Sequence, residues 1–206
     1  MIVNPEIESY LTELLPPRDA VLAEMEDQAS RRGIPIVGPV VGNLLAQLVR
    51  ISGAKRIFEL GSAIGYSTLW LARAAGSGAE VHYTDSSARN AEEAHRYFER
   101  AGVAAEVRIH IGDALDSLAS VSGEFDMVFN DIDKRSYAAV LETVPGRLRS
   151  GGLFVADNVL WRGQVTKPQE ENGRAIAEFN DKLFKSREFW SSVIPVRDGV
   201  SVAIRR

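Results

Sequence analysis

The sequence contains no cysteine, and its three histidines, His82, His95 and His110, are scattered along the chain. Without cysteine there can be no disulfide, no thiolate metal site and no cysteine nucleophile. This excludes a disulfide-stabilised secreted scaffold and disfavours a zinc centre.

Long apolar runs and an excess of basic residues are also missing. No stretch approaches the roughly 18 consecutive apolar residues of a membrane-spanning helix, so we expect no membrane partner. The first residues, MIVNPEIESYLTELL, lack a basic segment followed by an apolar run, so we expect no signal peptide and a cytoplasmic location. A formal net charge of −4 argues against a nucleic-acid partner, because such binding relies on neutralising phosphates.

The chain does have the composition of an ordinary globular domain. Its 206 residues are 45% hydrophobic and 25% charged, which is enough for one domain with a full core. Apolar residues recur at helical spacing over residues 6–15, 18–29 and 40–52. Pro16 and Pro17 separate the first two of these helices, and Gly53 marks the end of the third.

From residue 56 onward, strand patterns alternate with helix patterns. We predict strands at 56–60, 80–84, 106–111, 125–130 and 153–157, and helices at 67–75, 88–102, 113–119, 136–152 and 170–186. Two further strands, 191–196 and 200–206, are joined only by Arg197, Asp198 and Gly199 and therefore form a hairpin. The prediction is an α/β fold with a Rossmann-like, doubly wound, seven-stranded sheet, parallel except for an antiparallel last strand, plus the N-terminal helices.

The segment FELGSAIGYS joins the first strand to a helix, where such sheets bind nucleotide-like ligands. Gly61 and Gly65 allow a tight turn, and Ser67 offers a hydroxyl or a helix cap. The spacing is not the G-x-G-x-x-G of dinucleotide enzymes, and Glu59 would repel a pyrophosphate but attract a cationic group. Alternatively, the glycines serve only the packing of the turn.

Acidic residues also end the next strands. Asp85 stands where these folds carry a carboxylate for ribose hydroxyls, although it could equally cap a helix. Asp113 and Ala114 follow the third strand, and Asp131 the fourth. Together with Glu59, these carboxylates gather at one edge of the sheet, which indicates a ligand site there.

Six stretches, in this order and spacing, resemble the class I S-adenosylmethionine-dependent methyltransferases, and within them the metal-dependent catechol and caffeoyl-CoA O-methyltransferases. They are ELGSAIGYSTLWLA, HYTD, GDALDSL, FDMVFNDIDKRSY, GGLFVADNVLWRGQV and IPVRDGVSVAI. The resemblance implies a single methyltransferase domain over residues 1–206, with a cofactor-binding core at 37–206. It also implies that the helices of residues 1–36 shape the acceptor site and contact the second subunit of a homodimer.

The resemblance assigns roles to individual residues. Lys134 would be the catalytic base, and the divalent metal would be held by Asp131, Asp157 and Asn158. The cofactor, S-adenosylmethionine, would contact Val37, Glu59, Gly61, Ser67, Asp85, Ala114 and Asp131. Asn130 and Ile132 depart from the family pattern, so the wall of the site is expected to differ there.

The residue types fit this chemistry. Two carboxylates and an amide oxygen are hard donors that suit Mg²⁺, and also Mn²⁺ or Ca²⁺. A metal bound to two adjacent hydroxyls of an acceptor would orient them and ease deprotonation, while Lys134 takes the proton. On the other interpretation, Asp157 and Asn158 form a polar turn and Lys134 pairs with Asp131 or Asp133 at the surface. Asp133 itself could face the metal or point away.

We therefore predict an O-methyltransferase acting on a phenolic acceptor, a catechol-like vicinal diol. The rivals are a dinucleotide-binding oxidoreductase, a non-catalytic S-adenosylmethionine-binding protein and a nucleic-acid methyltransferase. Trp161 either lines the acceptor pocket or packs, and Tyr137 is expected to pack on the helix that follows it. Three arginines of the N-terminal helices, Arg18, Arg31 and Arg32, either meet an anionic tail such as coenzyme A or are simply solvated.

Overall fold

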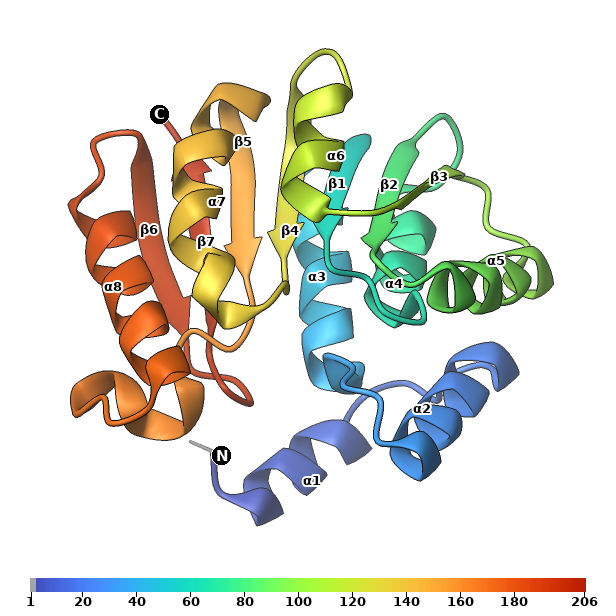
Figure 1. The fold of residues 1–206 in the computed structure, drawn as a ribbon. Coiled ribbons are helices and arrows are strands. Elements are labelled where there is room, and N and C mark those ends of the chain that lie inside the picture. The colour runs from blue at the N-terminus through green and yellow to red at the C-terminus, as the bar shows by residue number, and fades with distance from the viewer. Residues whose placement is uncertain (1–2) are drawn as a thin grey trace.

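A computed structural model describes residues 3–206 and contains one seven-stranded sheet between two layers of helices (Figure 1). The strands are β1 (Arg56–Leu60), β2 (Glu80–Asp85), β3 (Glu106–Ile111), β4 (Phe125–Asn130), β5 (Leu148–Ala156), β6 (Phe189–Ile194) and β7 (Val200–Arg205). Their order is β3-β2-β1-β4-β5-β7-β6, and β7 runs antiparallel to both of its neighbours. The predicted fold class is confirmed.

The helices bury the sheet on both faces. They are α1 (Pro5–Glu13), α2 (Ala20–Arg32), α3 (Gly38–Ser52), α4 (Tyr66–Ala75), α5 (Ala88–Ala101), α6 (Ala114–Ser120), α7 (Tyr137–Thr143) and α8 (Glu171–Lys185). One core cluster joins the sheet to α2, α3, α4 and α5, and the other joins it to α6, α7 and α8. The strands β1 and β4 are buried on both faces, so their centres, residues 57–58 and 127–129, are apolar without alternation.

Several predicted boundaries were wrong. The helix predicted over 136–152 ends at Thr143, and a 3₁₀ turn over Val144–Arg147 leads directly into β5. Proline at position 145 cannot continue an α-helix, because it has no N–H to donate. The strand β5 thus begins at Leu148 rather than at residue 153, and a register shift opposite Phe125 absorbs the extra residues. Similarly, β6 ends at Ile194, just before Pro195.

The site is positioned by the point where the strand order reverses. The chain passes from β1 outward to β2 and β3 and then returns to β4 on the other side of β1. Doubly wound sheets bind ligands at this point, outside the carboxyl ends of the strands. Helices α1 and α2 lie below that edge of the sheet (Figure 1).

The outer side of α1 carries exposed apolar side chains, Ile7, Tyr10 and Leu14. The homodimer contact expected of the N-terminal helices stays a prediction.

In the part of the chain from residue 3 onward, no helix combines the length and the apolar character that crossing a bilayer requires.

Candidate active site

A cavity of about 1400 Å³ opens at the carboxyl edge of the sheet. Its wall is built by the β1–α4 loop, the ends of β2, β4 and β5, the β6–β7 hairpin and one side of α1. Pockets for one drug-sized ligand measure about 300–1000 Å³. This cavity therefore has room for two ligands side by side.

Backbone strain is concentrated around the same cavity. Among residues 3–206, the non-glycine residues with left-handed φ values are Ala63, Asn158, Trp161, Arg162 and Arg197, and all five line the cavity. Each such conformation costs free energy and persists only where the surrounding structure enforces it. The clustering marks this edge as the functional one, independently of any motif.

Gly61 brings the end of β1 against the end of β4. Its φ is 80°, and a Cβ added there would lie 2.8 Å from the carbonyl oxygen of Asp131. The neighbouring amide of Asp131 donates to the carbonyl of Leu60 at 2.8 Å. Any side chain at position 61 would push these segments apart, so the glycine is required for the approach of Asp131 to the loop.

Among the predicted cofactor, metal and catalytic residues, Glu59 alone does not line the cavity. Its side chain is fully buried behind the glycine loop and accepts hydrogen bonds from the hydroxyls of Ser62, at 2.8 Å, and Thr68. The predicted direct contact between Glu59 and the cofactor is therefore not supported by its position. Burial raises the pKa of Glu59 from 4.5 to about 7, although hydrogen bonds from Ser67, Thr68 and Ser62 oppose the rise.

This raised pKa gives a testable stability effect. The unfolded chain ionises Glu59 above its ordinary pKa, whereas the folded chain resists ionisation until near pH 7, so folding stability falls as pH rises between these values. The substitution Glu59→Gln keeps an acceptor oxygen without the charge. We expect it to stabilise the ligand-free protein by roughly 1–3 kcal/mol at pH 8 and by almost nothing at pH 4.5, measured by urea unfolding. A pH-independent difference would contradict the assignment.

Asp85 lines the cavity at the end of β2 and also organises the glycine loop. One carboxylate oxygen accepts from the amide of Ala63 at 3.1 Å, and the other accepts from Ser87 N at 2.8 Å and from Asn90 Nδ2 at 3.1 Å. Asp85 therefore joins the β1–α4 loop to the turn between β2 and α5. Asp113, by contrast, is exposed and caps α6 through the amides of Leu115 and Asp116.

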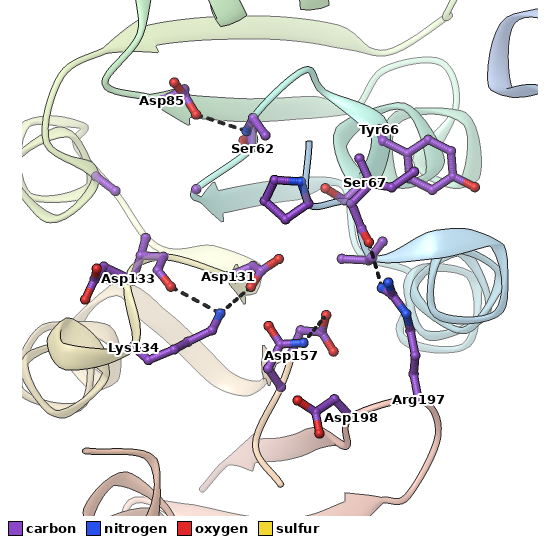
Figure 2. A pocket seen from close by; sticks show the side chains of 18 of the residues that line it. Ser62, Tyr66, Ser67, Asp85, Asp131, Asp133, Lys134, Asp157, Arg197 and Asp198 are labelled. Carbon is purple, nitrogen blue, oxygen red and sulfur yellow. Dashed lines mark hydrogen bonds and ion pairs between the residues drawn. The ribbon is translucent and has the colours of Figure 1, made fainter. Parts of the chain in front are cut away.

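Lys134 lies on the short turn after β4 and is largely buried. Its ammonium group donates to Asp131 Oδ1 at 2.6 Å, to the carbonyl of Ile132 at 3.2 Å and to the hydroxyl of Tyr137 at 2.9 Å. That hydroxyl donates in turn to the carbonyl of Asp157 at 2.8 Å. Lys134 is thus fixed inside the site, contrary to the surface alternative (Figure 2).

Asp131 and Asp157 stand side by side because β4 and β5 pair in parallel, with Asn130 opposite Ala156. Burial raises the pKa of Asp131 even though Lys134 opposes the rise, and burial together with the charge of Asp131 raises the pKa of Asp157. A buried carboxylate beside a half-buried one is stable in its charged form only with sufficient positive charge nearby.

The arrangement fits a hard divalent cation. Asp157 Oδ1 is buried and accepts no hydrogen bond, while its Oδ2 accepts from Asn158 Nδ2 at 3.1 Å. Asn158 adopts a left-handed φ of 57° next to these carboxylates. Within residues 3–206 no cluster of three or more histidine, aspartate or glutamate side chains has metal-binding geometry, and the candidate donors remain the two carboxylates and the amide oxygen of Asn158.

Asp133 has a structural role. Its Oδ1 accepts from the amide of Arg135 at 3.0 Å, and both carboxylate oxygens pair with the Arg135 guanidinium. Its carboxylate points away from Asp131 and Lys134 (Figure 2).

The expectation that Asn130 alters the wall of the site was wrong, because its side chain is fully buried and does not line the cavity.

The structure thus brings together most of the predicted residues. Those that line the cavity are Val37, Gly61, Ser67, Asp85, Ala114, Asp131, Lys134, Asp157 and Asn158, and Trp161 and Ile132 join them. Their contacts with a cofactor or metal stay predictions. Sequence reasoning missed Glu8, Arg197 and the hydroxyl of Tyr137, none of which carries a local signal.

The three N-terminal arginines do not serve the cavity. Arg18 pairs with Glu26, Arg31 with Asp27 and Arg32 with Glu93. None of the three lines the cavity wall. The suggestion that they receive an anionic tail therefore loses its support.

Comparison with known proteins provides evidence about the family of this chain that does not depend on the cavity. A family profile described as O-methyltransferase matches residues 17–206. The chain is 31% identical to a catechol O-methyltransferase of Niastella koreensis, covering 96% of both chains. It is 31% identical to a probable caffeoyl-CoA O-methyltransferase of Dictyostelium discoideum, over 75% of this chain and 71% of that one. The crystal structure of an O-methyltransferase from Bacillus cereus in complex with S-adenosylhomocysteine superposes with a TM-score of 0.88, at 29% identity and with 98% and 97% of the chains covered.

Proposed function

Since the chain belongs to the O-methyltransferase family, we propose that it transfers the methyl group of S-adenosylmethionine to one hydroxyl of a catechol-like vicinal diol, with the help of a divalent cation. The observation that carries this proposal is the adjacency of the Asp131–Asp157–Asn158 oxygen set and the buried Lys134 in one cavity with room for two ligands.

The half of the cavity around the glycine loop supports the cofactor assignment. Asp85 stands at the end of β2, where a carboxylate can accept both ribose hydroxyls. Val37, Ser67 and Ala114 line the same half, and Gly61 keeps the backbone close. When bound there, S-adenosylmethionine supplies an electrophilic methyl group. Its loss of that group would leave S-adenosylhomocysteine, the molecule held by the related Bacillus cereus protein.

The other half supports the metal and the acceptor. Asp131, Asp157 and Asn158 would hold a magnesium-like cation, which when bound orients two adjacent hydroxyls and stabilises their deprotonated form. Lys134, once in its neutral amine form, would take the proton from the hydroxyl that attacks, because contacts with three oxygen atoms hold its nitrogen at this point of the cavity. Tyr137 fixes the distance between Lys134 and the backbone of Asp157.

The charges of the acceptor half favour one class of acceptor. Glu8, Glu13 and Asp198 line it from α1 and the β6–β7 hairpin, and Arg162 and Arg197 are the nearby cations. With Asp131, Asp157 and Lys134 included, five carboxylates face three cations, so a bound divalent cation would balance the charges and leave no positive excess for a polyanion. We therefore propose a neutral or cationic catechol as the acceptor in preference to a polyanionic coenzyme A thioester.

The direct test is an assay with methyl-labelled S-adenosylmethionine. We expect label to enter a simple catechol but not the matching monophenol, in the presence of Mg²⁺. S-adenosylhomocysteine should bind and inhibit, whereas NAD should not bind, measured by calorimetric titration. Binding of NAD without binding of S-adenosylhomocysteine would overturn the proposal in favour of an oxidoreductase, and cofactor binding without methyl transfer to any catechol would favour a non-catalytic binding protein.

A further inference from the structure

Helix α1 forms a wall of the cavity although it has little packing of its own. No residue of α1 is buried, and the apolar side chains of its outer side are more than half exposed. Its cavity side repeats once per turn and consists of Pro5, Glu8, Ser9, Thr12 and Glu13. Such a helix needs a specific polar contact with the rest of the protein to keep its position.

Arg197, in the β6–β7 hairpin, provides that polar contact. Its Nη1 donates to the carbonyl of Ile36 at 2.7 Å, and its Nε lies 3.7 Å from Glu8 Oε1. The guanidinium also lies against Gly38, where an added Cβ would be 3.5 Å from Cζ. One side chain therefore joins α1, the segment before α3 and the hairpin.

Within the part of the chain that the structure describes, no second side-chain hydrogen bond or ion pair links α1 to another element. The other side-chain hydrogen bonds of the helix are local, because Asn4 Oδ1 accepts from the amide of Glu6 and the Thr12 hydroxyl donates to the carbonyl of Glu8. Glu8 Oε2 is buried and accepts no hydrogen bond, so Arg197 supplies the positive charge that this carboxylate has nearby. A partly buried carboxylate that loses its only counter-ion is expected to move toward water, because desolvation without pairing is costly.

The backbone of Arg197 supports a dedicated role. Its φ is 53°, a conformation that glycine adopts more readily than arginine, and the strain is retained at the cavity wall. A turn with this φ value would form more easily with glycine at position 197. The side chain, rather than the turn, accounts for the presence of arginine.

We propose that Arg197 is a positioning residue that holds α1, through Glu8, and the segment 34–38, through Ile36, against the cavity and thereby sets the acceptor site. The effect on the acceptor rests on the function proposed above, whereas the position of α1 can be tested in the protein alone. Val37, which lines the cavity, lies within the segment that Arg197 holds.

The first test is hydrogen exchange of the segment 5–13 in the full-length protein. We expect faster exchange in Arg197→Gln and in Glu8→Gln than in the wild type, and near-normal protection in Arg197→Lys, which keeps a cation. Arg31→Gln is the matched control, because it removes an arginine–carboxylate pair of the same region that lies off the cavity. Unchanged exchange in Arg197→Gln would overturn the proposal.

The second test separates positioning from chemistry. Arg197→Gln and Glu8→Gln should each raise the KM for a catechol about three- to tenfold, the size expected for a partly exposed charge pair with one charged hydrogen bond, and leave kcat within about twofold. The double variant should be no worse than the more affected single variant. A lower kcat at unchanged KM would overturn the positioning role. If the wild type methylates no catechol, the proposed function fails, while hydrogen exchange still decides the role of Arg197.

Discussion

Replacing Asp157 by alanine is expected to reduce methyl transfer by at least about 100-fold, because it removes one of the two carboxylates that we propose to hold the cation beside the acceptor. Binding of S-adenosylhomocysteine should change little, since the glycine loop and Asp85 lie on other strands. Initial rates at saturating Mg²⁺ and calorimetric titration of the cofactor product measure the two effects.

The fold should tolerate this change. The buried Asp157 and the half-buried Asp131 are like charges side by side, so removing one without a bound cation relieves repulsion. We expect the ligand-free variant to unfold at the same or a higher temperature than the wild type. Asp133→Asn is the matched control, because it removes an exposed carboxylate of the same edge and keeps an oxygen for the amide of Arg135. Equal losses in both variants would argue against a specific role of Asp157.

Replacing Lys134 by alanine is expected to lower kcat by about 10²–10⁴-fold, the usual contribution of a positioned proton acceptor. The side chain is buried at 9% exposure and is held by Asp131 and Tyr137, so its loss leaves a space next to the attacking hydroxyl. A small primary amine added to the solution should restore part of the activity by occupying that space. Single-turnover rates with preformed cofactor complex report the chemical step directly.

Arginine at the same position separates charge from proton transfer. Lys134→Arg keeps a cation near Asp131 but provides no usable base, because a guanidinium stays protonated. We expect it to be as inactive as Lys134→Ala while binding S-adenosylhomocysteine normally. Near wild-type activity in Lys134→Arg, or no rescue of Lys134→Ala by amines, would assign the lysine to electrostatics alone.

Much of this architecture is readable from the chain because its determinants are local. The alternation of strands and helices predicts the sheet, and parallel strands place their carboxyl ends together, which is why Asp85, Asp131 and Asp157 meet at one edge. The tight glycine loop is likewise encoded where it acts, since Gly61 sits directly against Asp131.

Features that depend on distant contacts were not predictable. Arg197 reaches a carbonyl 161 residues away in the sequence, and nothing around it indicates that partner. The negative charge of Glu59 at the end of β1 suggests a ligand contact, yet its side chain is fully buried and accepts hydrogen bonds from Ser62 and Thr68. The early start of β5 follows from a register shift against β4, which a pattern read along one strand does not contain.

The metal dependence of methyl transfer tests the account most directly. The protein is stripped with excess chelator, and the rate of catechol methylation from S-adenosylmethionine is followed as Mg²⁺ is added back. We expect no transfer above background in chelator, full recovery with Mg²⁺ in the wild type, and no recovery in Asp157→Ala. Full activity of the wild type in excess chelator would contradict the assignment of Asp131, Asp157 and Asn158 as a working metal site.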